Sequence, residues 1–84
     1  MLTVDLSSYA KRFLKRAEKQ LASRIIERIE KLAENPFPQD VKRVVGRTEK
    51  IFRIRLGDYR IQYSVIYERN ILFISDIDKR PRAY

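Results

Sequence analysis

The sequence contains no cysteine, no histidine and no tryptophan, and only two glycines among its 84 residues. Without cysteine the chain cannot form disulfides, zinc fingers or iron–sulfur clusters, and it has no thiol nucleophile. Without histidine it lacks the commonest general base of enzymes and the commonest ligand of transition metals. Asp76 and Asp78 are two carboxylates without a third ligand, which is a weak metal-binding set. We therefore expect neither a metal ion nor an organic cofactor.

Long hydrophobic runs are also missing. No stretch approaches the ~18 apolar residues that span a bilayer. The first residues lack the basic and then apolar pattern of a signal peptide. With 84 residues, of which 44% are hydrophobic, the chain can build one small core but not two. We expect a cytoplasmic protein with one domain over residues 1–84 and no membrane partner.

Positive charge is in excess and is unevenly distributed. The chain has 19 basic and 11 acidic residues, a net charge of +8. Residues 1–40 hold 8 basic and 6 acidic residues, whereas residues 41–84 hold 11 and 5, so +6 of the net charge lies in the second half. Such a balance favours a polyanionic partner: nucleic acid, ribosome, anionic membrane or acidic protein. We expect the second half to carry the function and the first half to be scaffold.

The first half is predicted to form a short strand and two helices. Residues 2–4 are a candidate strand. Apolar residues then recur at three- and four-residue intervals over 8–18 and 21–34, which predicts two amphipathic helices. Ser7 or Ser8 is the expected N-cap of the first helix. Two prolines within the loop 35–40 end the second helix.

After position 40 the apolar period changes to two, which indicates strands. The candidate strands are 41–45, 51–56, 59–65 and 71–74. Gly57-Asp58 separates the second and third of them, a two-residue link typical of a β-hairpin. The last strand is apolar on both faces, so we place it inside the sheet. The expected fold is α+β, with an N-terminal helical hairpin packed on a small twisted antiparallel β-sheet.

The hairpin is predicted to gather arginines on one face. A two-residue turn fixes the register, so Arg55 lies opposite Arg60, and Arg53 lies one pleat away. Apolar side chains of both strands fill the other face. Like charges placed opposite each other destabilise a sheet. The face is either a solvated surface partly paired with Asp76 or Asp78, or an anion-binding site. We favour the site, because guanidinium groups match phosphate geometry bidentately.

The C-terminal segment adds cations and an aromatic ring. If the last strand lies beside residues 59–65, Arg80 can reach the arginines of the hairpin. Tyr84 can stack on a nucleobase while arginines hold the nucleic-acid backbone. A tail that only packs against the domain is the alternative.

Two segments carry a resemblance to a known family. Residues 53–63 read RIRLGDYRIQY, and residues 79–84 read KRPRAY. Together they resemble the hairpin and terminus of the RelE/ParE toxin superfamily, and the preceding strand and helices agree with it. The resemblance implies a toxin of a type II toxin–antitoxin system. RelE-like members cut mRNA in the ribosomal A site, whereas ParE-like members inhibit DNA gyrase.

Residue roles follow from the resemblance by position. The positions that correspond to the catalytic set of RelE-like toxins are Arg53, Arg55, Arg60, Arg80 and Tyr84. Further RNA-binding residues are expected at Arg47, Lys50, Lys79 and Arg82. Because these positions carry suitable residues, the resemblance favours a metal-independent endoribonuclease, or mRNA interferase. The ribose 2′-OH would attack the adjacent phosphate, and the arginines would stabilise the charge that develops.

The resemblance also implies the partners. We expect the ribosome and mRNA as targets and an acidic RelB-like antitoxin that neutralises the basic face within a hetero-oligomer. An apolar segment of the antitoxin would pack on the helical hairpin or a sheet edge.

One departure from the family concerns the general base. The two basic positions of the first hairpin strand are often lysine in active members, and here both are arginine. Arginine is a poor proton acceptor because its pKa exceeds 12. The base is left open among Lys50, Lys79, Tyr84 and Asp78. Weak catalysis, a ParE-like gyrase inhibitor and a non-catalytic RNA- or ribosome-binding module are therefore the alternatives.

Overall fold

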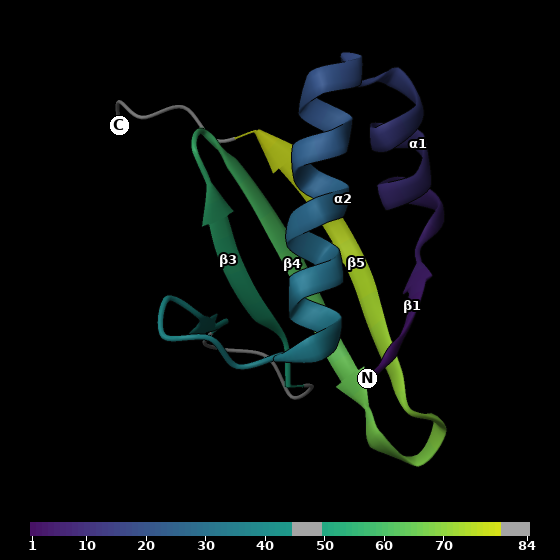
Figure 1. The fold of residues 1–84 in the computed structure, drawn as a ribbon, viewed down its shortest axis with the longest axis vertical. Helices are drawn as coiled ribbons and strands as arrows, with labels where there is room; N and C mark the ends of the chain where they lie inside the picture. The colour runs from purple at the N-terminus through teal and green to yellow at the C-terminus, as the bar shows by residue number, and fades with distance from the viewer. Residues whose placement is uncertain (45–49, 80–84) are drawn as a thin grey trace.

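The computed structural model describes residues 1–44 and 50–79 (Figure 1). In chain order the elements are β1 (Thr3–Leu6), α1 (Ser8–Arg16), α2 (Lys19–Glu34), β2 (Lys42–Arg43), β3 (Phe52–Leu56), β4 (Tyr59–Ile66), the 3₁₀ turn η1 (Tyr67–Arg69) and β5 (Ile71–Lys79). Neither helix is long and apolar enough to cross a membrane within these described ranges.

The strands form one sheet in the order β1-β5-β4-β3-β2. β5 lies between β1 and β4, so its predicted interior position is confirmed. The predicted α+β class is confirmed, but the sheet is mixed rather than wholly antiparallel. β1 runs parallel to β5, while the other neighbours are antiparallel. β1 joins the sheet beside the last strand of the chain, so no hairpin fixes its direction.

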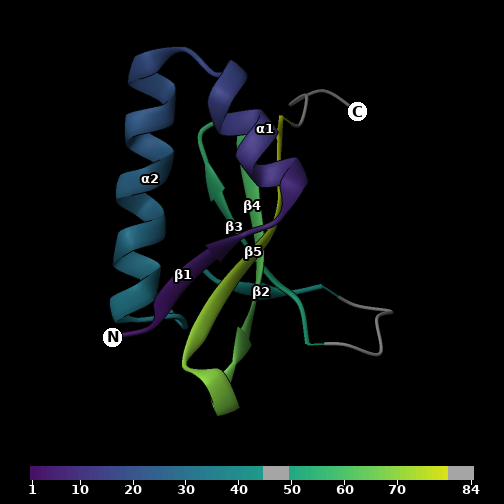
Figure 2. The ribbon, with the colours of Figure 1, turned by 90° about the vertical axis from the view of Figure 1, so that its right-hand side faces the viewer.

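Both helices begin close to their predicted starts. The Ser7 hydroxyl accepts a hydrogen bond from the Ala10 amide at 3.1 Å, which caps α1. α2 starts two residues before the predicted boundary and ends at Glu34, as expected. Its buried side chains are Ile25, Ile29, Leu32 and Ala33, which follow the helical period. Figure 2 shows α2 beside one face of the sheet and α1 near the upper end of the sheet.

The central hairpin has the predicted register. Leu56 pairs with Tyr59, and Arg55 pairs with Arg60. Gly57 adopts a φ of 62°, a conformation that suits glycine in a two-residue turn. The predicted strand 41–45 is shorter in the described residues, spanning Lys42–Arg43, and the last strand extends to Lys79.

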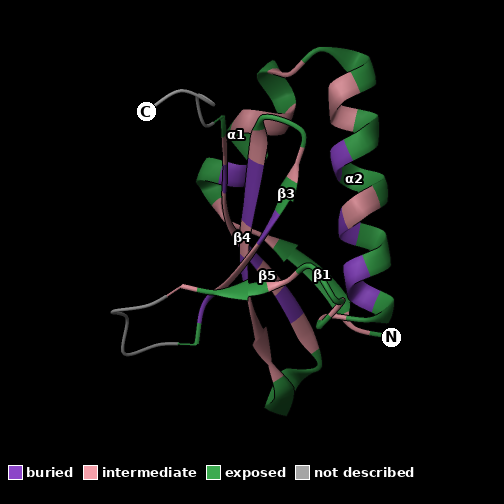
Figure 3. Cartoon of the chain, turned by 90° about the vertical axis from the view of Figure 1, so that its left-hand side faces the viewer, coloured by how far each residue is buried: buried purple, intermediate pink, exposed green. Residues whose placement is uncertain are grey.

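The core lies between the helices and one face of the sheet. Its buried side chains come from α1, α2, β3, β4 and β5. Figure 3 colours the backbone of buried residues purple. They are Ala10, Ile25, Ile29, Leu32, Ala33, Ile54, Ile61, Tyr63, Leu72, Ile74 and Ile77. The apolar face predicted for the hairpin therefore contributes to this core, and the arginines are left on the opposite face.

A β-bulge in β5 changes which residues face the core. Tyr63 pairs with Ile74 and Gln62 pairs with Asp76, so Ser75 is an extra residue without a cross-strand partner. The Ser75 hydroxyl donates to the Gln62 carbonyl at 3.2 Å, and the Ser7 hydroxyl donates to the Ser75 carbonyl at 2.8 Å. Beyond the bulge Ile77 faces the core, so Asp76 and Asp78 on either side of it face away from the core.

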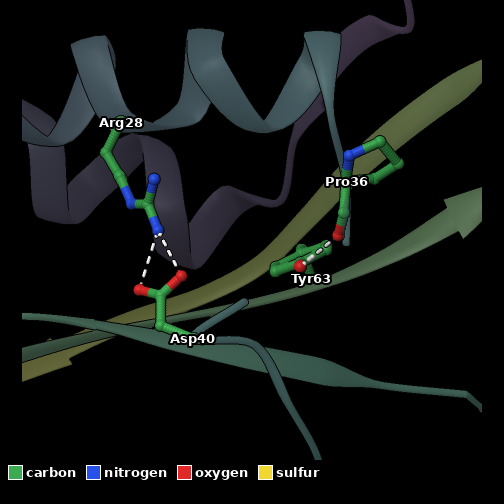
Figure 4. Close-up of polar contacts among 4 residues, drawn as sticks. All are labelled: Arg28, Pro36, Asp40 and Tyr63. Atoms are coloured by element: carbon green, nitrogen blue, oxygen red, sulfur yellow. Dashed lines mark hydrogen bonds and ion pairs between the residues drawn. The ribbon is translucent and has the colours of Figure 1, made fainter. Parts of the chain in front are cut away.

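The loop after α2 is fixed by two polar contacts (Figure 4). The Arg28 guanidinium donates to both carboxylate oxygens of Asp40, at 2.9 and 2.8 Å. The Tyr63 hydroxyl donates to the Pro36 carbonyl at 2.5 Å. Tyr63 is fully buried, and burial raises its pKa to about 12 from an ordinary value of 10.0. These contacts tie the loop to α2 and β4.

The raised pKa of Tyr63 predicts an alkaline loss of stability. The unfolded chain releases the phenolic proton near pH 10 and the folded protein near pH 12, so stability falls between these values as pH rises. Two pKa units correspond to about 3 kcal/mol. Tyr63→Phe removes this loss but also one hydrogen bond, which costs about 1 kcal/mol. In urea unfolding, wild type should be the more stable protein at pH 8 and the phenylalanine variant at pH 12.

Tyr67→Phe is the control, because Tyr67 is 70% exposed. Its unfolding free energy should parallel that of wild type across this range. If the Tyr63→Phe and wild-type curves remain parallel instead, the phenol of Tyr63 does not control alkaline unfolding.

Candidate functional site

The side of the sheet opposite to the core gathers charged and polar residues in two rows. We call it the arginine face; it consists of Lys42, Arg53, Arg55, Arg60, Gln62, Asp76 and Asp78. The row nearer the hairpin turn runs Arg55–Arg60–Asp78 across β3, β4 and β5. The next row runs Lys42–Arg53–Gln62–Asp76 from β2 to β5. Cations therefore lie toward the β2 edge, and carboxylates lie on β5.

The cationic half of this face is accessible. Arg55 and Lys42 are exposed, and Arg53 is half-buried. These three side chains line a hollow of about 380 Å³ together with Asp40 and Ile54. Within residues 1–44 and 50–79, none of the three cations forms an ion pair with a carboxylate. A cluster of this kind is suited to an anion such as a phosphate.

Arg60 has a different environment from the other arginines. It is 8% exposed and forms an ion pair with Asp78, its cross-strand neighbour on β5. Its Nε and Nη2 atoms lie 3.5 and 3.4 Å from the two carboxylate oxygens. Charge-assisted hydrogen bonds are usually about 2.7–2.9 Å long, so this side-on pair is loose. Asp78 thus occupies the edge of the guanidinium formed by Nε and Nη2.

Not all predicted site residues lie on the arginine face. Lys79 pairs with Tyr59 and lies on the helical side of the sheet, where it lines a separate hollow with Phe13 and Arg16. Lys50 is exposed and precedes β3 by two residues. Four predicted site residues lie outside the described residues: Arg47, Arg80, Arg82 and Tyr84.

The structure adds Lys42 to the groups singled out from the sequence and shows how Asp76 reaches the same face. Lys42 lies beside Arg53, a placement that depends on the pairing of β2 with β3. The apolar alternation that predicts a strand at 41–45 does not show which other strand it pairs with. Asp76 completes the second row, because the bulge at Ser75 turns it onto this face. The sequence signal for this bulge is the three-residue spacing between Ile74 and Ile77, because inward-facing residues of a regular strand are two or four apart.

Comparison with known proteins identifies the family. Residues 4–84 match the model of the ParE toxin of the type II toxin–antitoxin system parDE. The chain therefore belongs to this toxin family, within the RelE/ParE superfamily that the hairpin and terminus resemble. It is also 39% identical over 61 residues to the candidate toxin RelE1 of Methanocaldococcus jannaschii, covering 69% of this chain and 67% of that protein.

Solved structures show the same fold. The RelE–RelB complex of the archaeon Pyrococcus horikoshii contains a chain with a TM-score of 0.81 and 29% identity, covering 98% of both chains. The isolated RelE toxin of E. coli gives a TM-score of 0.84 at 19% identity, covering 99% of this chain and 88% of that one. The predicted α+β arrangement is therefore that of RelE toxins.

Proposed function

We propose that the protein is a toxin that cleaves mRNA in the ribosomal A site, with the arginine face as its phosphate-binding surface. One observation carries this proposal: Lys42, Arg53 and Arg55 lie together without carboxylate partners in the described part of the chain. Cross-strand repulsion between Arg55 and Arg60 costs some tenths of a kcal/mol, so folding alone does not favour the cluster.

The chemistry suits guanidinium groups. The 2′-hydroxyl of a ribose gives up its proton and attacks the adjacent phosphorus, while the bond to the 5′-oxygen breaks and that oxygen takes up a proton from water. The products are a 2′,3′-cyclic phosphate and a 5′-hydroxyl. Negative charge accumulates on the phosphate oxygens, where Arg53 and Arg55 stabilise it. Arg80 would add to this charge stabilisation, and Tyr84 would stack on a base and orient the nucleotide. No step in this sequence requires a metal ion.

The proton acceptor for the 2′-hydroxyl must come from another group, because arginine remains protonated. Lys79 lies on the helical side of the sheet, away from Arg53 and Arg55. Lys50, Asp78 and Tyr84 are therefore the candidates. Among them, Asp78 lies in the same row as Arg55 and Arg60.

The proposed partner that restrains the toxin is an acidic antitoxin. The Pyrococcus horikoshii relative, whose chain is 29% identical, is a RelE–RelB complex. A net charge of +8 favours association with a negatively charged protein. Binding of such a partner over the arginine face would block phosphate binding and form a toxin–antitoxin hetero-oligomer.

A second candidate is inhibition without RNA cleavage. It is favoured by Arg60, which is buried and already paired with Asp78. In this alternative the protein blocks the ribosome or another target, such as the DNA gyrase inhibited by ParE-like toxins, through binding alone.

The test is translation in a purified system with a defined mRNA, followed by mapping of the new 5′ ends. The proposal expects cuts within A-site codons that appear only when ribosomes are present. Blocked translation without cuts would establish ribosome binding alone. Undisturbed translation together with inhibited supercoiling by purified gyrase would establish the ParE-like alternative.

A further inference from the structure

The proposed cleavage needs a proton donor as well as a proton acceptor. When the bond between phosphorus and the 5′-oxygen breaks, its electron pair stays on that oxygen, which must then take up a proton. A side chain positioned to deliver this proton accelerates such a step by about 10²- to 10⁴-fold. The side chains that line the hollow beside Arg53 and Arg55 are the ones within reach of a phosphate bound there.

Among residues 1–44 and 50–79, one side chain of this hollow can serve as the donor. The titratable residues that line it are Asp40, Lys42, Arg53 and Arg55. The two arginines hold their protons too firmly, because the pKa of a guanidinium exceeds about 12. Both carboxylate oxygens of Asp40 accept hydrogen bonds from Arg28, at 2.9 and 2.8 Å (Figure 4). Lys42 is left, and its ammonium group has three N–H donors.

The pairing of β2 with β3 fixes the place of Lys42. It lies opposite Arg53, and opposite side chains lie on the same face of a sheet, about 5 Å apart at Cβ. The Val44 amide donates to the Ile51 carbonyl at 2.8 Å, which continues this pairing beyond β2. On the other side of Lys42, Val41 packs against the core. The backbone is therefore held on both sides, while the Lys42 side chain is exposed beside the hollow.

The acidic and basic groups of the arginine face lie on opposite sides of Arg53 and Arg55. Lys42 lies toward β2, whereas Asp78 lies toward β5. Within the described ranges the Lys42 ammonium forms no ion pair with a carboxylate. The attacking and leaving oxygens of an in-line reaction lie on opposite sides of phosphorus. A leaving oxygen directed toward Lys42 therefore places the attacking ribose on the side of Asp78, which is one of the candidate proton acceptors.

We propose that Lys42 is the general acid of the reaction and donates a proton to the 5′-oxygen as the bond from that oxygen to phosphorus breaks. The neutral amine then regains a proton from water, so water is the net source. The proton of the 2′-hydroxyl goes to the separate acceptor. Lys42 thus supplies the proton transfer that Arg53 and Arg55 cannot, while these arginines hold the phosphate. This role deepens the proposed function and rests on it.

The test uses two mRNAs that differ in one atom at the A-site cleavage position. One has the ordinary 5′-oxygen, and the other has sulfur in its place. A thiolate is a much weaker base than an alkoxide, so it leaves without taking up a proton. Lys42→Ala should lower the single-turnover rate on ordinary mRNA about 10²-fold, and the rate on sulfur mRNA by less than about threefold. Equal loss on both mRNAs, or no loss on either, would overturn the proposal.

Matched variants separate proton transfer from charge. Lys42→Arg keeps the positive charge but releases its proton poorly, so it should behave like Lys42→Ala on both mRNAs. Arg55→Ala should lose activity on both, because Arg55 stabilises charge on the phosphate. Arg43→Ala removes a cation from the other face of β2, opposite Phe52, and should cut both mRNAs like wild type. Wild-type cleavage of ordinary mRNA by Lys42→Arg would show that Lys42 contributes charge alone.

The absence of cysteine from the chain permits a chemical rescue. Alkylation of Lys42→Cys with bromoethylamine places an amine where the lysine amine was, and cleavage of ordinary mRNA should return. Alkylation with iodoacetamide adds a neutral amide and should not restore cleavage; equal rescue by both reagents would overturn the proposal. Wild type that cuts neither mRNA would refute the proposed function itself. Wild-type cleavage that no Lys42 variant alters would refute the general acid alone.

Discussion

Arg55→Ala should lower the rate of ribosome-dependent mRNA cleavage by about 10²- to 10³-fold, a loss typical of removing one donor that stabilises transition-state charge. Arg55 is exposed in the cationic half of the arginine face and lines the same hollow as Lys42 and Arg53. The measurement is the rate of appearance of A-site cuts under single-turnover conditions. Arg69→Ala is the matched control, since Arg69 is exposed and lies in η1, outside the arginine face.

The same substitution should not destabilise the protein. Arg55 lies directly opposite Arg60, and like charges in that arrangement repel. Arg55→Ala should therefore keep the wild-type unfolding free energy or raise it by a few tenths of a kcal/mol, measured in urea. Loss of cleavage together with retained stability would assign Arg55 to phosphate chemistry. Retained cleavage in a folded Arg55→Ala protein would contradict the proposed function.

The parts of the fold that follow from local rules were predictable from the sequence. The two-residue turn at Gly57 fixes the hairpin register, and the register places Arg53, Arg55 and Arg60 on one face. The helices follow from apolar periodicity, and the N-cap was expected at Ser7 or Ser8, of which Ser7 is the cap. Each of these features depends on residues close together in the chain.

The parts that depend on distant segments were not predictable in the same way. β1 pairs in parallel with β5, at the far end of the chain, and no turn constrains that choice. The placement of Lys79 shows the limit most clearly. Simple alternation from Ile74 would direct Lys79 to the arginine face, but the bulge at Ser75 reverses the alternation. The same reversal brings Asp78 to Arg60 and so changes the charge of the site.

The extra residue in β5 has no cross-strand partner, so the ladder stays in register without it. If Ser75 is deleted, Asp76 follows Ile74 directly and keeps its pairing with Gln62, so Asp76 and Asp78 still face away from the core while Ile77 faces it. The deletion removes the hydrogen bond from the Ser75 hydroxyl to the Gln62 carbonyl and the one that the Ser75 carbonyl accepts from the Ser7 hydroxyl, each of which contributes about 1 kcal/mol. The deletion variant should therefore be less stable by about 2 kcal/mol and still show a cooperative thermal transition by circular dichroism.

Ser75→Ala distinguishes the bulge from the hydroxyl. It keeps the extra residue and removes only the hydrogen bond from the Ser75 hydroxyl to the Gln62 carbonyl, so it should cost about 1 kcal/mol and unfold cooperatively. A deletion variant without a cooperative transition would show that the bulge itself is required for the pairing of β4 with β5. The expected result, a cooperative transition in both variants, would instead show that Asp78 stays beside Arg60 whether or not the extra residue is present.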